Sequence, residues 1–150
     1  MHEAIELSKK GMLNKDAGPF GCVIVKNEII VGRGNNRVTS TNDPTAHAEV
    51  VAIRDACKNL NDFQLDDCEI FTSCEPCPMC LGAIYRARPK AIYFANNRED
   101  TAAAGFDDTM LYDEMKCGIN ERKIPINTLG RAKAIKVFEA WKLYENKIEY

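Results

Sequence analysis

Apolar residues recur along the chain with two different spacings, which predict helices in some stretches and strands in others. Residues 3–15 carry apolar positions at helical spacing, whereas residues 20–26 and 29–34 are short runs rich in Val and Ile. Asn27-Glu28 separates these two runs, and a short polar turn between two such runs is typical of an antiparallel hairpin. The chain is therefore predicted to open with an amphipathic helix and a pair of strands.

Helices and strands are predicted to alternate through the rest of the chain. Asp43-Pro44 is a signal for a helix start, because Asp can accept from free N–H groups and Pro loses nothing at the first helical position. That helix is expected over residues 45–60. The other expected elements are strands at 68–72 and 91–95, a helix from Pro78 that ends before Pro89, weaker helical patches at 101–104 and 109–115, and a helix at 131–145.

Two of these helices have an apolar stripe that we expect to face a core. In the first the stripe consists of Ala48, Val51, Ala52 and Ala56; in the last it consists of Ala134, Val137, Phe138, Trp141 and Tyr144. A hairpin followed by alternating strands and helices predicts an α/β layered domain, with parallel pairing in the later strands. A length of 150 residues suits one domain.

Composition narrows the classes of function. Lys and Arg number 20 against 22 Asp and Glu, a formal net charge of −2, which excludes the strong basic field of a general nucleic-acid binder. The apolar runs are too short to cross a bilayer, so no membrane partner is expected. Residues 2–6 have neither the basic nor the apolar region of a secretory signal, and we expect a cytoplasmic protein.

Cysteine is the unusual part of the composition. There are seven, an odd number, and Cys74, Cys77 and Cys80 crowd into seven residues. In a cytosolic chain, such crowding indicates metal or catalytic chemistry more often than disulfide bonding.

Two short segments at predicted helix starts carry the chemistry: His47-Ala48-Glu49 and Pro76-Cys77-Pro78-Met79-Cys80. Zn²⁺ favours imidazole and thiolate ligands, so His47, Cys77 and Cys80 are predicted to hold one Zn²⁺ per chain. Three protein ligands leave the fourth tetrahedral position for a water or hydroxide. Glu49 is close enough to carry protons without coordinating, and the combined pattern matches the signature of zinc deaminases.

Cys74 leaves an alternative open. Cys74, Cys77 and Cys80 resemble the start of an iron–sulfur motif, but Ile84 occupies the position where its fourth cysteine would lie. Cys74 could instead complete a structural zinc site with four protein ligands, in a non-catalytic interaction module. Cys22, Cys57, Cys68 and Cys117 are most simply small core residues.

The sequence resembles the cytidine-deaminase-like superfamily, and within it the bacterial guanine deaminase branch, from Gly18-Pro19-Phe20-Gly21 to the last residue. The stretches that carry the resemblance are 42–50, 73–85, Ala104-Gly105-Phe106-Asp107-Asp108 and Lys147-Ile148-Glu149-Tyr150. The first two are shared with other deaminases, including tRNA adenosine deaminases, whereas the last two point to the guanine branch. The resemblance implies a three-layer α/β/α fold with a central mixed sheet of about five strands.

The resemblance also implies roles for individual residues. Zn²⁺ would be held by His47, Cys77 and Cys80, while Glu49 would shuttle protons. Phe20 would form a wall against the base, Asn36 would hydrogen-bond to its ring, and Ala48 would offer a backbone contact. Asp108 would bind the amide edge of guanine and assist proton transfer, because an ionised carboxylate only accepts hydrogen bonds and suits the ring N–H and amine of guanine. Tyr150 would cover the site.

The implied activity is that of a zinc-dependent aminohydrolase that acts on a cyclic amidine and converts guanine to xanthine and ammonia. Its partners would be a small nucleobase and a second copy of the chain, with the C-terminal segment, about residues 130–150, exchanged between subunits; no nucleic acid is expected. Alternatives are deamination of another nucleobase or nucleoside, such as guanosine or cytosine, or of a tRNA adenosine. Arg86 departs from the guanine branch, where an aromatic residue is expected, and could lie at the subunit seam or pocket mouth.

Overall fold

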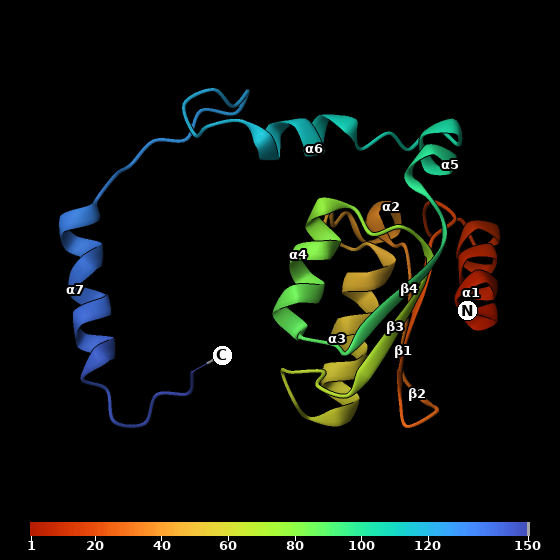
Figure 1. The fold of residues 1–150 in the computed structure, drawn as a ribbon, viewed down its shortest axis with the longest axis horizontal. Coiled ribbons are helices and arrows are strands. Elements are labelled where there is room, and N and C mark those ends of the chain that lie inside the picture. Colours follow the sequence, from red (N-terminus) through yellow and green to blue (C-terminus); the bar gives the residue numbers. More distant parts are fainter. Residues whose placement is uncertain (150) are drawn as a thin grey trace. The chain divides into compact units, whose positions relative to one another are not determined.

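The chain divides into two compact units, Met1–Tyr112 and Asp113–Tyr150, in a computed structural model that describes residues 1–149. The boundary falls within the helix α6 (Thr109–Lys116), and each unit is described by itself. The first unit contains all the strands found among the described residues (Figure 1). No helix in residues 1–149 combines the length and the apolar character needed to span a membrane.

The sheet of the first unit has the strand order β2-β1-β3-β4. The hairpin strands β1 (Gly21–Lys26) and β2 (Ile29–Asn35) are antiparallel, and β1 is also antiparallel to β3 (Cys68–Cys74). β3 and β4 (Ala91–Asn96) are parallel, as expected for strands joined by a helix. The predicted mixed sheet is therefore confirmed, with four strands in the described residues where about five were expected.

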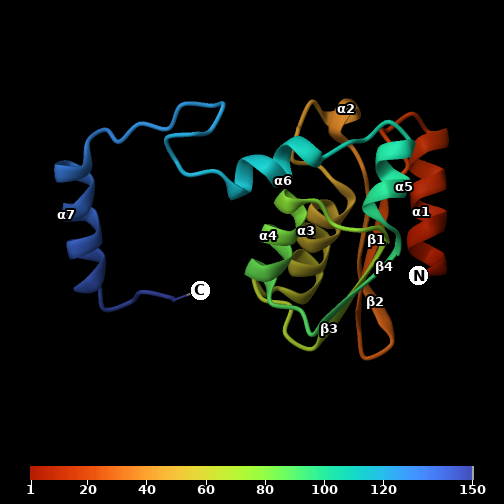
Figure 2. The same cartoon turned by 45° about the horizontal axis from the view of Figure 1, so that its top comes forward.

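Helices cover both faces of this sheet, which makes the predicted three layers (Figures 1 and 2). α1 (His2–Leu13) lies on one face, and α3 (Ala48–Leu60) and α4 (Pro78–Ala87) lie on the other. Glycines permit the close approach: a Cβ on Gly21 would collide with the backbone of α1, and one on Gly34 with the backbone of α3. The sheet thus holds the start of α3 tightly against β2.

The core lies between the sheet and the helices α3 and α4. Ile24, Ile70 and Ile84 are at most 1% exposed and represent β1, β3 and α4 in this cluster. From the predicted stripe of α3, Ala48, Ala52 and Ala56 are fully buried and Val51 is half-buried. Burial of this stripe fixes which face of α3 meets the sheet.

The connection between β2 and α3 differs from the prediction. A short helix, α2 (Val38–Thr41), was not predicted, and α3 begins at Ala48 and not at residue 45. The expectation that Asp43 caps the helix is wrong, because its Oδ1 accepts from the backbone N–H and hydroxyl of Thr45, at 2.8 and 2.7 Å. His47, the residue directly before α3, has extended backbone.

Two short helices follow β4 as the sequence indicated, α5 (Arg98–Ala103) and α6. The second unit contains α7 (Arg131–Lys142), which ends three residues earlier than predicted. Its apolar stripe was expected to face a core, but Val137 and Phe138 are each 67% exposed and Trp141 is 43% exposed. Within the second unit nothing covers this stripe, because a unit of this size has no sheet of its own among the described residues.

Candidate active site

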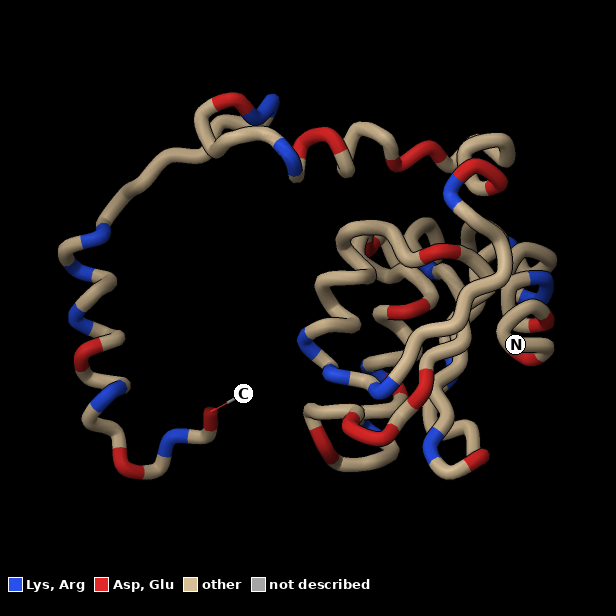
Figure 3. The backbone as a smooth tube through the Cα atoms, in the orientation of Figure 1, with Lys and Arg blue, Asp and Glu red and all other residues tan. Residues whose placement is uncertain are grey.

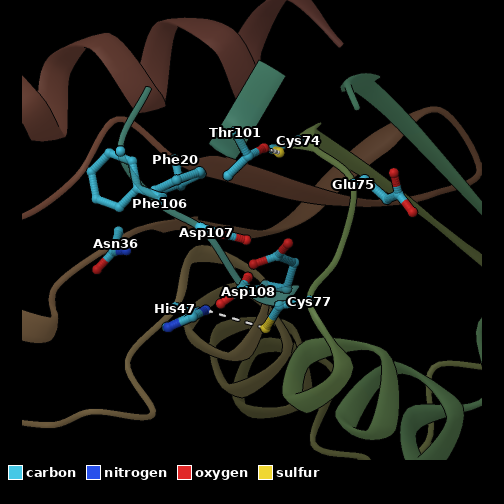
Figure 4. Close-up of a pocket in the computed structure, with 12 residues that line it drawn as sticks. Phe20, Asn36, His47, Cys74, Glu75, Cys77, Thr101, Phe106, Asp107 and Asp108 are labelled. Carbon is cyan, nitrogen blue, oxygen red and sulfur yellow. Dashed lines mark hydrogen bonds between the residues drawn. The ribbon is translucent and has the colours of Figure 1, made fainter. Parts of the chain in front are cut away.

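A cavity of about 310 Å³ opens in the first unit, among segments that are far apart in sequence. Its twelve lining residues come from the residue before β1, the ends of β2 and β3, the starts of α3 and α4, α5 itself, and the loop between α5 and α6 (Figure 4). Phe20, Asn36, His47, Glu49, Cys77 and Asp108, all predicted site residues, lie in this wall. The fold therefore brings most of the predicted site together in one place.

The starts of α3 and α4 have the same local backbone geometry, which directs the N-cap side chain of each helix toward the cavity. His47 and Cys77 are the N-cap residues of α3 and α4, and both have extended backbone, with ψ of 156° and 167°. Pro78 follows Cys77 at the first position of α4, where its missing N–H costs nothing. A thiolate at a helix N-terminus is stabilised by the partial positive charge of the free N–H groups.

His47, Cys77 and Cys80 form a cluster whose ligand atoms all lie within 4.8 Å of one another. The Nδ1 atom of His47 is 3.6 Å from the Sγ atom of Cys77 and 3.5 Å from that of Cys80. Tetrahedral Zn²⁺, with bonds of about 2.3 Å to sulfur and about 2.0–2.1 Å to nitrogen, requires a separation of about 3.6 Å between these atoms. The cluster therefore has the spacing of a zinc site.

Electrostatics also make the cluster suited to a divalent cation. Hydrogen bonds from Cys80 and His47 lower the pKa of Cys77 to about 4, although burial opposes the shift. The pKa of Cys80 moves in the opposite direction, because it shares a hydrogen bond with Cys77, is buried and lies near the carboxylate of Glu49. Cys77 therefore ionises readily, whereas ionisation of Cys80 is unfavourable without a cation. A bound cation would stabilise both thiolates.

Glu49 is 6% exposed and held from two sides. The hydroxyl of Thr72 donates to its Oε1 at 3.1 Å, and the Sγ atom of Cys80 donates to its Oε2 at 3.4 Å. Burial raises the pKa of this carboxyl above its usual value. A carboxyl group that is oriented, buried and raised in pKa is equipped to accept a proton and to return it.

Asn36 and Asp108 add polar groups of opposite kind to the wall. The Oδ1 of Asn36 accepts from the backbone N–H of Val38 at 3.0 Å, which leaves the amide nitrogen as the donor for a ligand. Asp108 is half-buried, and burial together with the Cys77 thiolate raises its pKa. Asn36 and Asp108 thus offer a donor and a carboxylate acceptor to a polar ring.

An aromatic corner closes one side of the cavity. Phe20 and Phe106 meet edge to face, with ring centroids 5.0 Å apart. No role was assigned to Phe106 from the sequence. In the structure, Gly105 before it has φ of +91°, a conformation that glycine adopts readily and that occurs in sharp turns. Gly18 makes room for the Phe106 ring, since a Cβ there would lie 2.9 Å from its Cζ.

Two other residues singled out from the sequence, Ala48 and Arg86, do not line the cavity. Ala48 is the first residue of α3, where backbone N–H groups have no acceptor within the helix, and it is fully buried. Tyr150 lies outside the described residues. Arg86 is exposed on α4 and does not line the cavity.

Cys74 lines the cavity but is not part of the metal cluster. Its Sγ atom lies 2.6 Å from the hydroxyl oxygen of Thr101 on α5. That contact holds the side chain on the far side of the cavity from His47, as Figure 4 shows. Among the described residues, the cluster therefore has three protein ligands, as the catalytic interpretation requires.

Carboxylates dominate the charge of the cavity wall. Glu49, Glu75, Asp107 and Asp108 line it, and no Lys or Arg among the described residues does. Figure 3 shows Lys and Arg interspersed with Asp and Glu along the backbone. This distribution suits an uncharged ring better than a phosphate backbone.

Comparison with known proteins agrees with this geometry. Residues 1–96 match the cytidine and deoxycytidylate deaminase zinc-binding region, and the chain belongs to this family of zinc-dependent hydrolytic deaminases. Within the family, the whole chain is 51% identical to guanine deaminase of Bacillus subtilis, and covers 96% of that protein. The X-ray structure of guanine deaminase from the same organism superposes with a TM-score of 0.96 at 52% identity, over 99% of this chain and 95% of that one.

A second group of relatives is similar over a shorter region. The tRNA-specific adenosine deaminase of Streptococcus pyogenes serotype M18 is 43% identical over 100 residues, which are 66% of this chain and 62% of that protein. The predictions of the deaminase family, the α/β fold and the zinc cofactor are thereby confirmed.

Proposed function

We propose that this protein hydrolyses guanine to xanthine and ammonia. The observation that carries the proposal is the similarity to guanine deaminase, which extends over the whole chain, whereas similarity to the tRNA-specific enzyme covers two thirds of it. The donor of Asn36 and the carboxylate of Asp108 in one cavity support a polar, bicyclic base as the substrate.

In this proposal, His47, Cys77 and Cys80 hold the zinc ion. When bound, zinc acts as a Lewis acid and makes water a nucleophile at neutral pH. Glu49 takes a proton from the water as a C–O bond forms at C2 of guanine. Glu49 passes this proton to the ring nitrogen next to C2, then takes the proton of the new hydroxyl group and delivers it to the exocyclic nitrogen as the C–N bond breaks and the C=O bond forms, so that ammonia leaves and xanthine remains. Thr72 keeps the carboxylate oriented through its hydrogen bond to Oε1.

The substrate is held in this proposal by groups of three kinds. Phe20 packs against the ring, Asn36 donates to it, and the backbone of Ala48 offers a further contact. Asp108 accepts from the ring N–H and amine of guanine and assists proton transfer. Adenine presents an acceptor where guanine has its ring N–H, so the same carboxylate would be poorly paired with adenine.

The proposed assembly is a homodimer that exchanges its C-terminal segments, about residues 130–150, so that each Tyr150 closes the partner's cavity. The exposed apolar stripe of α7 supports this proposal, since a contiguous apolar surface of this kind is typical of an interface. A cytoplasmic location is part of the same proposal, because a reducing compartment keeps the two ligand cysteines available for zinc.

Zinc content and ammonia release distinguish the candidate substrates. The purified protein is expected to carry one zinc per chain and to release ammonia from guanine much faster than from guanosine, adenine, cytosine or cytidine. Equal or faster release from another member of that panel would contradict the proposed substrate, and zinc without any turnover would favour an interaction module.

A further inference from the structure

The end of β2 contains a polar pair that the catalytic site does not use directly. We infer that Asp16 and Asn35 are positioning residues, which fix the neighbouring Asn36 so that its amide nitrogen donates to an acceptor atom of the substrate ring. This inference rests on the proposed function, because it concerns how the same cavity recognises its base.

Asn35 is 8% exposed and bridges two opposite charges. Its Nδ2 donates to the Oδ2 of Asp16 at 2.9 Å, and its Oδ1 accepts from the Nε of Arg37 at 3.4 Å. An amide placed between a carboxylate and a guanidinium satisfies both in only one of its two orientations. The side chain of Asn35 is therefore fixed in direction as well as in place.

The surrounding structure is shaped to receive this side chain. The side chain of Asn35 packs against α1, since a Cβ on Gly11 of α1 would lie 2.5 Å from its Nδ2. A buried helical glycine lowers helix propensity, so its presence is explained by the space that Asn35 requires. The site of the pair is thus built into the packing of α1.

Fixing Asn35 restrains the next two residues, the first of which, Asn36, lines the cavity. The N–H of Asn36 donates to the carbonyl of Phe20 at 3.0 Å, and the N–H of Arg37 donates to the carbonyl of Ala46 at 2.9 Å. These bonds tie the segment to the aromatic wall on one side and to the residue before His47 on the other. With its Oδ1 already bonded to Val38, Asn36 presents only its Nδ2 donor to the cavity.

Substitution of Asp16 can test this arrangement with little effect on the rest of the structure. Among the described residues, the only partner of its carboxylate is Asn35. Its backbone carbonyl separately accepts from the Thr39 hydroxyl at 2.9 Å and from the Ser40 N–H at 3.0 Å. Asp16→Ala therefore removes the contact to Asn35 and keeps the backbone bonds of the loop.

We expect Asp16→Ala to raise KM for guanine about tenfold while kcat changes less than twofold. This is the result expected when an enzyme loses a contact that it makes equally with the bound substrate and with the transition state. Asp16→Asn keeps an acceptor and should restore KM to within about twofold of the unmodified chain. Asp62→Ala is the matched control, because Asp62 accepts from the backbone N–H of Gln64 in a turn that is not part of the cavity wall.

Two further measurements separate positioning from loss of structure. In an Asn36→Ala background, Asp16→Ala should change KM by less than about twofold, because a residue that acts through Asn36 has nothing left to act on. The second is the ratio of kcat/KM for guanine to that for 7- and 9-deazaguanine, which keep the reacting amidine and lack the acceptor nitrogen of the five-membered ring. On one preparation this ratio does not depend on the folded fraction, and Asp16→Ala should lower the largest ratio about tenfold.

Several results would overturn the inference. The first is that Asp16→Ala leaves both KM and the deazaguanine ratios unchanged. The second is that Asp16→Ala raises KM about tenfold even in the Asn36→Ala background. The third is that the unmodified chain does not distinguish guanine from any deazaguanine. An unmodified chain that carries zinc but does not turn over guanine would contradict the proposed function instead.

Discussion

Glu49 shows how burial gives one carboxyl group a chemical role that other carboxyl groups of the chain lack. It is 6% exposed, is oriented by Thr72, and lies two residues after His47 without joining the metal cluster. Exposed carboxylates, such as that of Glu6 on α1, have no comparable environment. The role proposed for Glu49 can therefore be separated from metal binding by a substitution that preserves shape.

Glu49→Gln is expected to retain zinc and to lose about 10²–10⁴-fold in kcat, the usual contribution of a general acid–base group. Zinc content by atomic absorption and ammonia release from guanine check the two parts. Glu6→Gln is the control and should match the unmodified chain in both. Turnover that persists in Glu49→Gln would show that another group moves the proton.

Cys80 is a predicted zinc ligand, so its loss should have effects that loss of a cysteine outside the metal cluster does not have. Cys80→Ser is expected to remove zinc, since three protein ligands leave no redundancy, and to lower the thermal midpoint, because a ligand that binds only the folded state stabilises it. Cys117→Ser should keep one zinc per chain, because Cys117 lies outside the cluster and serine can replace its hydrogen bond to the carbonyl of Asp113. Zinc content together with calorimetry, before and after chelation of the unmodified chain, checks this expectation. Full zinc in Cys80→Ser would mean that Cys74 or a carboxylate can complete the site.

At the scale of the elements, the turn before α3 has a pH dependence whose sign can be worked out. Hydrogen bonds from the Thr45 hydroxyl and N–H hold the pKa of Asp43 below its usual value. A group whose pKa is lower in the folded state adds stability above its unfolded pKa of about 3.9, and this stability is lost as pH falls through the folded pKa. Asp43→Asn cannot ionise, so the difference in urea midpoint between it and the unmodified chain should shrink between pH 5 and about 3. A difference that stays constant over that range would show that ionisation of Asp43 does not contribute.

The contact between β2 and α3 leads to a prediction about packing. A Cβ on Gly34 would meet the carbonyl of Ala48 and the N–H of Ala52, which are backbone atoms that cannot move independently of α3. Gly34→Ala is expected to destabilise the fold by about 1–3 kcal/mol, and to weaken zinc retention because the start of α3 carries His47. Gly82→Ala on α4 is the matched control, since nothing lies within 4 Å of its added Cβ, and it should be neutral or stabilising by up to about 1 kcal/mol. Urea unfolding with zinc analysis measures both.

Prediction from the sequence succeeded where the determining interactions are local. The helix start at Pro78 and the ligand spacing of Cys77 and Cys80 follow from neighbouring residues, and α4 begins where it was expected. The start of α3 was misplaced because Asp43 has two local uses, as a helix cap and as the acceptor of a turn, and the sequence alone does not choose between them.

Other features depend on contacts between distant parts of the chain. The place of β3 beside β1 is set by pairing across more than forty residues, as in Cys22 with Thr72, so the strand order was not predicted. The same holds for the contact of Phe20 with Phe106 and for the bond between Asp16 and Asn35. Residue type and spacing gave no sign of these contacts.

At the scale of the whole molecule, the proposed exchange of C-terminal segments predicts complementation between two defective chains. One chain carries Glu49→Gln, and the other is truncated after residue 146 and so lacks Tyr150. If the segments exchange, a mixed dimer has one cavity with an intact Glu49 closed by a complete segment, and it should have about half of the activity of an unmodified dimer, or about a quarter averaged over all dimers when the two chains pair at random. If each segment closes its own cavity, co-expression should give no more activity than the sum of the two chains expressed separately.

The two ligand-bearing helix starts have a consequence for how the protein is produced. His47 and Cys77 are thirty positions apart, so an ion bound to both would be a reversible cross-link between the starts of α3 and α4. A cross-link between two points of a chain lowers the entropy of the unfolded chain and so stabilises the folded state. This stabilisation is lost when the ion is removed. In zinc-starved cells, the amount of intact protein should therefore fall along with the catalytic rate of each molecule.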